Sequence, residues 1–135
     1  MAVRKVILDT NAFSALFRGD EKVLKSISRA QCVYVSAVVA GELMAGFRGG
    51  SRYRENMEIF EEFLSEPEVE FLPVAFETCD YFALIKNDLT RNGTPIPIND
   101  VWLGAQCLEN GAVLITYDRH FTHIPGLRLW SGYLG

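Results

Sequence analysis

Four acidic residues stand at positions where a protein fold could gather them at one site: Asp9, Glu42, Asp100 and Asp118. Each has an ordinary role when taken singly, as a turn residue, a helix cap or a partner for a helix dipole. Taken together they point to a metal site. Clustered carboxylates repel one another and raise each other's pKa values, and a divalent cation removes that penalty.

The ligand types at such a site favour Mg²⁺ or Mn²⁺, because carboxylate oxygens select hard cations over zinc. The two histidines, His120 and His123, share one segment, and no cysteine is near them in the sequence. A magnesium ion held by carboxylates usually serves phosphate chemistry, where it activates a water molecule and neutralises charge on the phosphate.

The segments around these acids alternate between strand and helix patterns. We expect strands over Val3–Asp9, Cys32–Val35, Val69–Leu72, Ala112–Thr116 and Leu127–Trp130. We expect helices over Asn11–Arg18, after a cap at Asp20, over Ala37–Arg48 after a cap at Ser36, and over Arg52–Leu64, Phe76–Asn92 and Asn99–Glu109. Residues 117–126 are expected to form a loop, and Ile59, Phe60 and Phe63 to be buried.

This alternation predicts an α/β fold with a mostly parallel sheet, in one domain over residues 1–135. Apolar runs such as Val6–Leu8 are typical of parallel strands that are covered on both faces. Ligands of open α/β sheets bind beyond the carboxyl ends of the strands. Asp9 and Asp118 follow expected strands, and Asp100 opens a helix. Glu42 interrupts a helix of small apolar residues, where a partly buried carboxylate needs a partner.

Composition and charge set broad limits on function. Hydrophobic residues make up 49% and charged residues 22% of the 135 residues, which is typical of a globular protein. No stretch approaches the roughly 20 apolar residues of a membrane span. The net charge is −4, but residues 55–80 hold nine acids and no Lys or Arg, which leaves the remainder at +5 and permits a polyanionic partner. Three widely spaced cysteines and the lack of a secretory pattern lead us to expect a cytoplasmic protein.

Four sequence blocks resemble the signature blocks of PIN-domain ribonucleases. They are Ile7–Phe13, Ser36–Leu43, Ile98–Ala105 and Leu114–Phe121, and together they extend over most of the chain. The length and the opening segment most resemble the VapC-type toxins of toxin–antitoxin pairs. The resemblance implies a twisted, mostly parallel sheet with helices on both faces and a metal-dependent endoribonuclease activity.

The resemblance also assigns roles to individual residues. It places Asp9, Glu42, Asp100 and Asp118 in the catalytic acidic quartet, with Asp9, Asp100 and Asp118 as the metal ligands. It implies that Asn11 and Thr116 orient the carboxylates or a metal-bound water molecule. Many relatives carry a further acid near Asp118. Arg119 and His120 stand there in this chain, so we expect them to contact the substrate, and the choice between one and two metal ions stays open.

The implied partners are an RNA substrate, a cognate antitoxin protein and a second copy of the chain in a homodimer, without a membrane. The implied cofactor is Mg²⁺, with Mn²⁺ as an alternative. The main alternative function is a catalytically silent PIN-fold module that binds protein or RNA. A phosphatase of the haloacid-dehalogenase type is disfavoured because it requires Asp-x-Asp, and here Asn11 occupies the second position. A receiver domain lacks support because no Lys follows the late strand, and neither a P-loop nor a GxGxxG motif is present.

Overall fold

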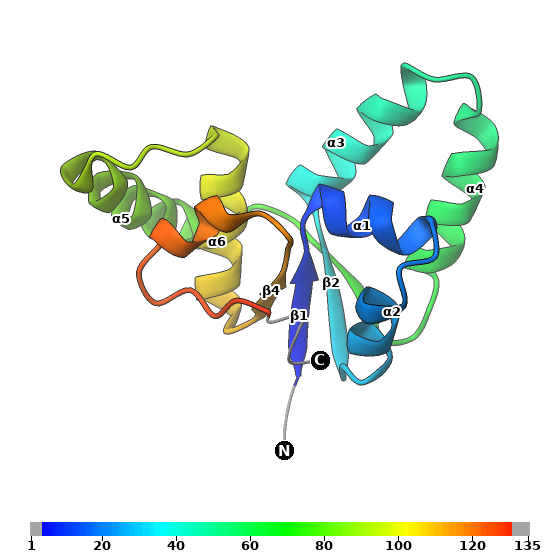
Figure 1. Ribbon diagram of the computed structural model, residues 1–135, viewed down its shortest axis with the longest axis horizontal. Helices are drawn as coiled ribbons and strands as arrows, with labels where there is room; N and C mark the ends of the chain where they lie inside the picture. Colours follow the sequence, from blue (N-terminus) through cyan, green and yellow to red (C-terminus); the bar gives the residue numbers. More distant parts are fainter. Residues whose placement is uncertain (1–3, 131–135) are drawn as a thin grey trace.

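The fold is built around a four-stranded sheet in which every strand runs in the same direction (Figure 1). It is seen in a computed structural model that describes residues 4–130. The strands are β1 (Lys5–Leu8), β2 (Cys32–Ser36), β3 (Val69–Leu72) and β4 (Val113–Ile115), in the order β3-β2-β1-β4. The predicted parallel α/β fold is therefore confirmed, although Val3, the expected start of β1, lies outside the described residues.

Helices cover both faces of this sheet, as predicted. The helices are α1 (Thr10–Phe17), α2 (Glu21–Ser28), α3 (Ala37–Arg48), α4 (Tyr53–Leu64), α5 (Phe76–Asn92) and α6 (Ile98–Asn110). Figure 1 shows α1 to α4 on one side of the strands and α5 with α6 on the other. Among the helices of residues 4–130, none combines the length and the apolar character needed to cross a bilayer.

The predicted caps explain why two of these helices begin where they do. The carboxylate of Asp20 accepts a hydrogen bond from the Val23 amide at 3.0 Å, which satisfies a free N–H in the first turn of α2. The Ser36 hydroxyl accepts one from the Val38 amide at 3.1 Å at the start of α3. Gly93 and Gly111 end α5 and α6 in the left-handed conformation, with φ of 67° and 63°.

Three local expectations were wrong. Leu127–Trp130 is not a strand, because only Leu129 pairs with the sheet, in an isolated bridge to Leu114. The expected loop over 117–126 contains a short 3-10 helix, η1 (Arg119–His123), whose single turn leaves no periodic apolar pattern in the sequence. Ile59 is 49% exposed, because α4 turns it away from the core on which its neighbour Phe60 packs.

The core lies on both sides of β1. Ile7 and Leu8 are fully buried, together with Leu114 and Ile115 from β4. On the α1–α4 side, the ring of Phe13 packs edge-on against Phe60 and Phe63, with centroids 6.2 and 5.4 Å apart. This aromatic cluster fixes α1 against α4. Because α1 begins immediately after Asp9, the same packing fixes the backbone at the carboxyl end of β1.

Candidate active site

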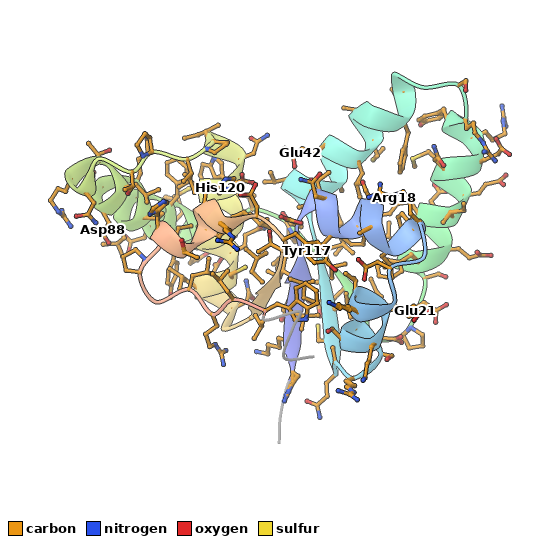
Figure 2. All side chains as sticks on the ribbon, in the orientation of Figure 1. Arg18, Glu21, Glu42, Asp88, Tyr117 and His120 are labelled. Carbon is orange, nitrogen blue, oxygen red and sulfur yellow. The ribbon has the colours of Figure 1, made fainter. Side chains whose placement is uncertain are left out.

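The four predicted acids come from four separate segments, which meet where the strand order reverses. The chain moves from β1 to β2 on one side, and later returns across the sheet to place β4 on the other side of β1. Asp9 follows β1 directly, and Asp118 follows β4 and caps η1. Such a reversal opens a crevice beyond the carboxyl ends of the strands. Figure 2 shows Glu42 and His120 projecting into this region from opposite sides, one from α3 and the other from η1.

Asp9 is the most enclosed of the acids, with only 6% of its surface exposed. Its backbone N–H donates to the Ile115 carbonyl of β4 at 3.2 Å. This hydrogen bond holds Asp9 between β1 and β4, where the strand order reverses. One carboxylate oxygen accepts from the Ala12 amide at 2.8 Å, so Asp9 also caps α1. The other oxygen accepts from the Thr116 hydroxyl. Asp9 therefore has both the structural role of a cap and a fixed place in the acidic cluster.

Burial raises the pKa of Asp9 above the usual range of an aspartate. The hydrogen bonds from Thr116 and Ala12 oppose that shift, while the negative charges of Asp100 and Asp118 add to it. Burial also raises the pKa of Asp100, where contact with His120 opposes the shift and the charges of Glu42 and Asp118 add to it. The four carboxylates therefore lie close enough together for electrostatic repulsion between them.

His120 lies between two of these acids. Its Nε2 is 2.7 Å from the Asp100 carboxylate, and its Nδ1 is 2.9 Å from the Asp118 carboxylate. The His120 backbone N–H also donates to Asp118 at 3.2 Å. The side chain of His120 is 25% exposed, so the ring is accessible at the surface of the cluster. The structure thus places His120 inside the acidic cluster rather than beside it.

Glu42 is held by two side chains that sequence reasoning missed. The hydroxyl of Thr10 donates to one of its carboxylate oxygens, and the Asn99 amide donates to the other at 3.0 Å. Thr10 directly follows Asp9, and Asn99 directly precedes Asp100. The only sequence feature that could have indicated this role for Thr10 and Asn99 is their position next to two candidate acids. The half-buried Glu42 therefore has the polar partners that a carboxylate in an apolar helix requires.

Thr116 forms hydrogen bonds with two of the acids. Besides donating to Asp9, its hydroxyl accepts a hydrogen bond from the Asp118 amide at 2.9 Å, so one side chain links two of the acids. Asn11 is exposed on the first turn of α1, and within residues 4–130 no hydrogen bond joins it to the four carboxylates. Arg119 is exposed on η1, directly after Asp118.

A buried glutamine sets the position of α6 and hence of Asp100. The side chain of Gln106 is fully buried and accepts a hydrogen bond from the Ser36 hydroxyl at 2.5 Å. Its amide nitrogen donates to the carbonyls of Leu72 and Pro73 at 3.2 and 3.3 Å. Gln106 thus ties α6 to the carboxyl ends of β2 and β3. A lone Gln in an apolar helix gave no sequence signal for this role.

The donor set suits a hard divalent cation in its chemistry. Every predicted ligand offers carboxylate oxygen. Burial raises the pKa of Asp9 and of Asp100, and the neighbouring acids add to the shift, so a cation would favour the ionised form of both. The side chains do not form a complete coordination shell. Within residues 4–130, no three acidic, histidine or cysteine side chains are arranged so that they could hold one metal ion. Instead, the imidazole of His120 lies between Asp100 and Asp118.

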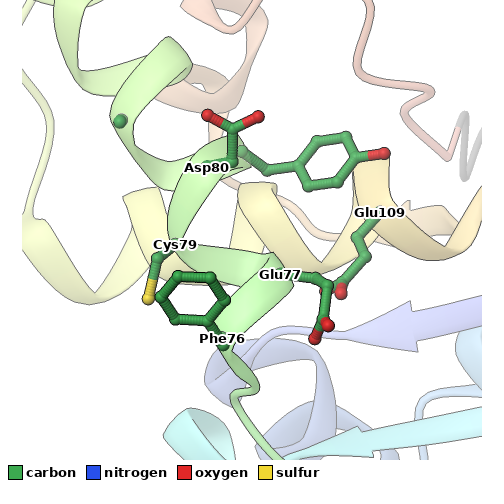
Figure 3. A pocket seen from close by; sticks show the side chains of 7 residues that line it. Phe76, Glu77, Cys79, Asp80 and Glu109 are labelled. Carbon is green, nitrogen blue, oxygen red and sulfur yellow. The ribbon is translucent and has the colours of Figure 1, made fainter.

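A separate hollow lies away from the acids, beside the start of α5 and the end of α6 (Figure 3). It has a volume of about 900 Å³ and is lined by residues that include Phe76, Cys79 and Glu109. Asp100 and Glu109 occupy opposite ends of α6, which separates the hollow from the carboxylates by about 13 Å along the helix axis. The hollow is therefore not part of the acidic site.

Comparison with known proteins supports the predicted resemblance. A PIN domain family model matches residues 6–127. The chain is 28% identical over 132 residues to Ribonuclease VapC1 of Haemophilus influenzae strain R2866, covering 94% of this chain and 96% of that protein. It is 28% identical over 96 residues to the tRNA(fMet)-specific endonuclease VapC of Salmonella typhimurium, covering 70% of this chain and 71% of that protein.

Solved structures show the same fold. A chain in the structure of VapBC-1 from nontypeable Haemophilus influenzae matches with a TM-score of 0.85 and 25% identity, covering 96% of this chain and 98% of that one. A chain in the DNA-bound VapBC structure from Salmonella typhimurium matches with a TM-score of 0.85 and 24% identity, covering 96% and 99%.

Proposed function

The chain belongs to the PIN-domain family, and from this premise we propose that it is a metal-dependent endoribonuclease and the toxin of a toxin–antitoxin pair. One observation carries the proposal. Four carboxylates from separate segments converge where the strand order reverses, and the surroundings raise the pKa of two of them. Such a cluster is costly to fold, because burial and neighbouring like charges both disfavour the ionised carboxylates, and a bound cation would offset that cost. The similar Haemophilus protein is named a ribonuclease.

We assign the reaction to hydrolysis of an RNA phosphodiester bond at these carboxylates. A bound Mg²⁺ or Mn²⁺ ion would activate a water molecule and neutralise charge that develops on the phosphate. Asp9, Asp100 and Asp118 would hold the ion. Thr116 fixes the carboxylate of Asp9 through its hydroxyl and the Asp118 backbone through that residue's N–H.

Glu42 is our candidate for accepting a proton from the attacking water. It projects toward the same region as His120, and the donors Thr10 and Asn99 hold its carboxylate in place. Both donors fix the orientation of the Glu42 carboxylate, as a general base requires. Arg119, exposed beside Asp118, is positioned to contact a phosphate of the bound RNA.

The proposed protein partner is a cognate antitoxin. The VapC-type toxins that this chain resembles are paired with an antitoxin, and both solved structures described above are of VapBC and share the fold over nearly all of this chain. We also propose a homodimer and a cytoplasmic location. The three cysteines are free thiols in the structure, as the reducing cytoplasm would maintain them.

The proposal is tested by incubating the purified chain with labelled total RNA, in Mg²⁺ or Mn²⁺ and in EDTA. The Asp100→Asn variant is assayed in parallel, because it removes a ligand charge while preserving the shape of the side chain. We expect metal-dependent fragments from the wild-type protein, and none in EDTA or from the variant. Fragments of equal yield from Asp100→Asn would refute the assigned role of that residue.

A catalytically silent module that binds protein or RNA is the second candidate function, and His120 is the observation in its favour. The imidazole bridges Asp100 and Asp118 with both ring nitrogens, so two of the proposed ligands have a partner without any ion. The two candidates differ in their response to metal. A nuclease site gains stability when Mn²⁺ is added, whereas a silent module melts at the same temperature with and without the ion.

A further inference from the structure

Positive charge collects at the opposite edge of the sheet from the carboxylates. Two adjoining hollows of about 510 and 290 Å³ lie at the amino ends of β1 and β4, and both are lined by Arg4, Lys5 and Val113. Arg128 lines the first hollow and Arg29 the second. Together they form one groove, here called the amino-edge groove. Among the described residues that line it, none is acidic.

Like charges are held close together in the amino-edge groove. Loss of hydration and the positive charge of Arg128 both lower the pKa of Arg4. The guanidinium of Arg128 donates to the Gly111 carbonyl just past the end of α6, which keeps its charge at this position. The two guanidinium groups are close enough for their charges to interact, so both contribute positive charge to this groove.

The groove also supplies neutral hydrogen-bonding groups around these cations. The side chains of Gln31 and Asn110 line one hollow, and Ser26 and Trp130 line the other. Glu68 and Glu70 belong to the β3 margin of the sheet. Because β2 separates β3 from β1, those carboxylates lie about two strand spacings, or roughly 10 Å, from Lys5.

Helix α2 connects the groove with the catalytic edge. Lys22, Lys25 and the C-cap residue Arg29 follow one another at spacings of three and four residues, so they share one face, which Glu21 flanks at the start of the helix. At the start of α2, Asp20 accepts a hydrogen bond at 2.7 Å from the hydroxyl of Tyr117, the residue before Asp118. Towards its end, Ser26 accepts one at 2.7 Å from the indole N–H of Trp130, in the groove.

We propose that the amino-edge groove and the basic face of α2 bind backbone phosphates of the RNA whose cleaved bond lies at the carboxylates. The inference rests on the proposed function and extends it. Helix α2 is about 12 Å long and begins beside Tyr117, so a folded RNA held at the carboxylates reaches the groove along its basic face. Guanidinium groups recognise phosphate oxygens through paired N–H donors, without regard to base sequence.

The test uses a double variant, Lys5→Gln with Arg29→Gln, because both side chains are exposed and line the groove. The matched control is Lys86→Gln with Arg91→Gln, which removes the same charge from the exposed surface of α5. Binding of labelled bulk transfer RNA and of a labelled trinucleotide is measured by fluorescence anisotropy at several salt concentrations. EDTA is present throughout, so that binding is measured without cleavage.

We expect the groove variant to lose affinity for transfer RNA but not for the trinucleotide, which is too short to extend beyond the catalytic edge. Each phosphate contact contributes about 0.7 to the slope of log affinity against log salt. Two lost contacts therefore lower the slope by about 1.4 and weaken binding about 25-fold at about 0.1 M salt. The control variant is expected to bind both RNAs as the wild type does.

Two results would overturn the proposal: unchanged affinity for transfer RNA in the groove variant, or an equal loss in the α5 control. Duplex DNA of similar length serves as a further probe, and a loss confined to DNA would also overturn the assignment to RNA. Because binding is measured without cleavage, an inactive protein that loses RNA affinity in the groove variant would refute the proposed nuclease activity while supporting this groove.

Discussion

Gly104 is the position at which a single added methyl group most directly tests how the site is held together. It lies one turn after Asp100 on α6, and a Cβ built there would be 2.7 Å from Cδ1 of Ile124 and 3.6 Å from Cδ1 of Ile85. Ile124 directly follows η1, the segment that carries His120, and is itself buried. The absence of a side chain at Gly104 thus allows η1 to approach α6 closely enough for His120 to reach Asp100.

Gly104→Ala is expected to lower both stability and activity. Carbon atoms in contact are normally about 3.5–4.0 Å apart, so the Cδ1 end of the Ile124 side chain must move by about 1 Å within a packed core. Such overpacking typically costs about 1–3 kcal/mol. For a chain of 135 residues, a loss of about 2 kcal/mol lowers Tm by about 7 °C. Any part of this displacement that reaches η1 also moves Asp118 and His120, and a misplacement of about 1 Å can slow catalysis by about 100-fold.

Two further variants complete this experiment. Gly46→Ala on α3 is the matched control, because nothing lies within 4 Å of a Cβ built there, and it should stabilise the helix by about 0.5–1 kcal/mol. Ile124→Val removes the Cδ1 atom that clashes, so combining it with Gly104→Ala should recover most of the lost activity. The measurements are thermal unfolding and RNA cleavage at saturating metal. The reasoning is refuted if Gly104→Ala is as stable and active as the wild type, or if Ile124→Val gives no recovery.

Three other variants test the electrostatics of the site. Burial raises the pKa of Asp9 and Asp100, so the metal-free native protein binds more protons than the unfolded chain, and these groups reduce stability as the pH rises above about 4. Asp100→Asn should therefore raise the Tm of the metal-free protein at pH 7 but not at pH 3; equal effects at both would contradict this. Thr116→Val removes the hydroxyl that links Asp9 with Asp118 and should reduce metal affinity or cleavage about 10–100-fold, which a Mn²⁺ titration and a rate measurement would detect. Arg119→Ala should raise the RNA concentration needed for half-maximal rate while leaving the saturated rate close to that of the wild type; a loss confined to the saturated rate would count against a phosphate contact.

Most of the fold could be predicted because local signals and tertiary packing agree. Helices Ala37–Arg48 and Phe76–Asn92 and strand Val69–Leu72 have the predicted bounds, and the Asp20 and Ser36 caps form as expected. The errors arose where only tertiary contacts decide. Leu129 pairs with Leu114 through a single bridge, because the Leu114 N–H donates to Arg128 and the Trp130 N–H donates back to Leu114, and no further residues join the ladder.

The candidate site likewise has one part that could be predicted from the sequence and one part that could not. The acids could be predicted because a parallel sheet brings the residues that follow its strands to one edge, and Asp9 and Asp118 both follow strands. The side chains around them could not. Thr10 and Asn99 contact Glu42 across 32 and 57 residues of sequence. The approach of His120 to Asp100 depends on the packing of η1 against Gly104, which no local pattern indicates.

Direct measurement of metal binding tests the central claim, that the four carboxylates form a cation site. Free Mn²⁺ is followed by electron paramagnetic resonance as protein is added, for the wild type and for Asp9→Asn with Asp100→Asn. Both proteins are first shown to be folded by circular dichroism. We predict that the wild-type protein depletes the free Mn²⁺ signal and that the double variant leaves it unchanged. A folded wild-type protein that binds no Mn²⁺, or a double variant that binds it equally well, would contradict the account.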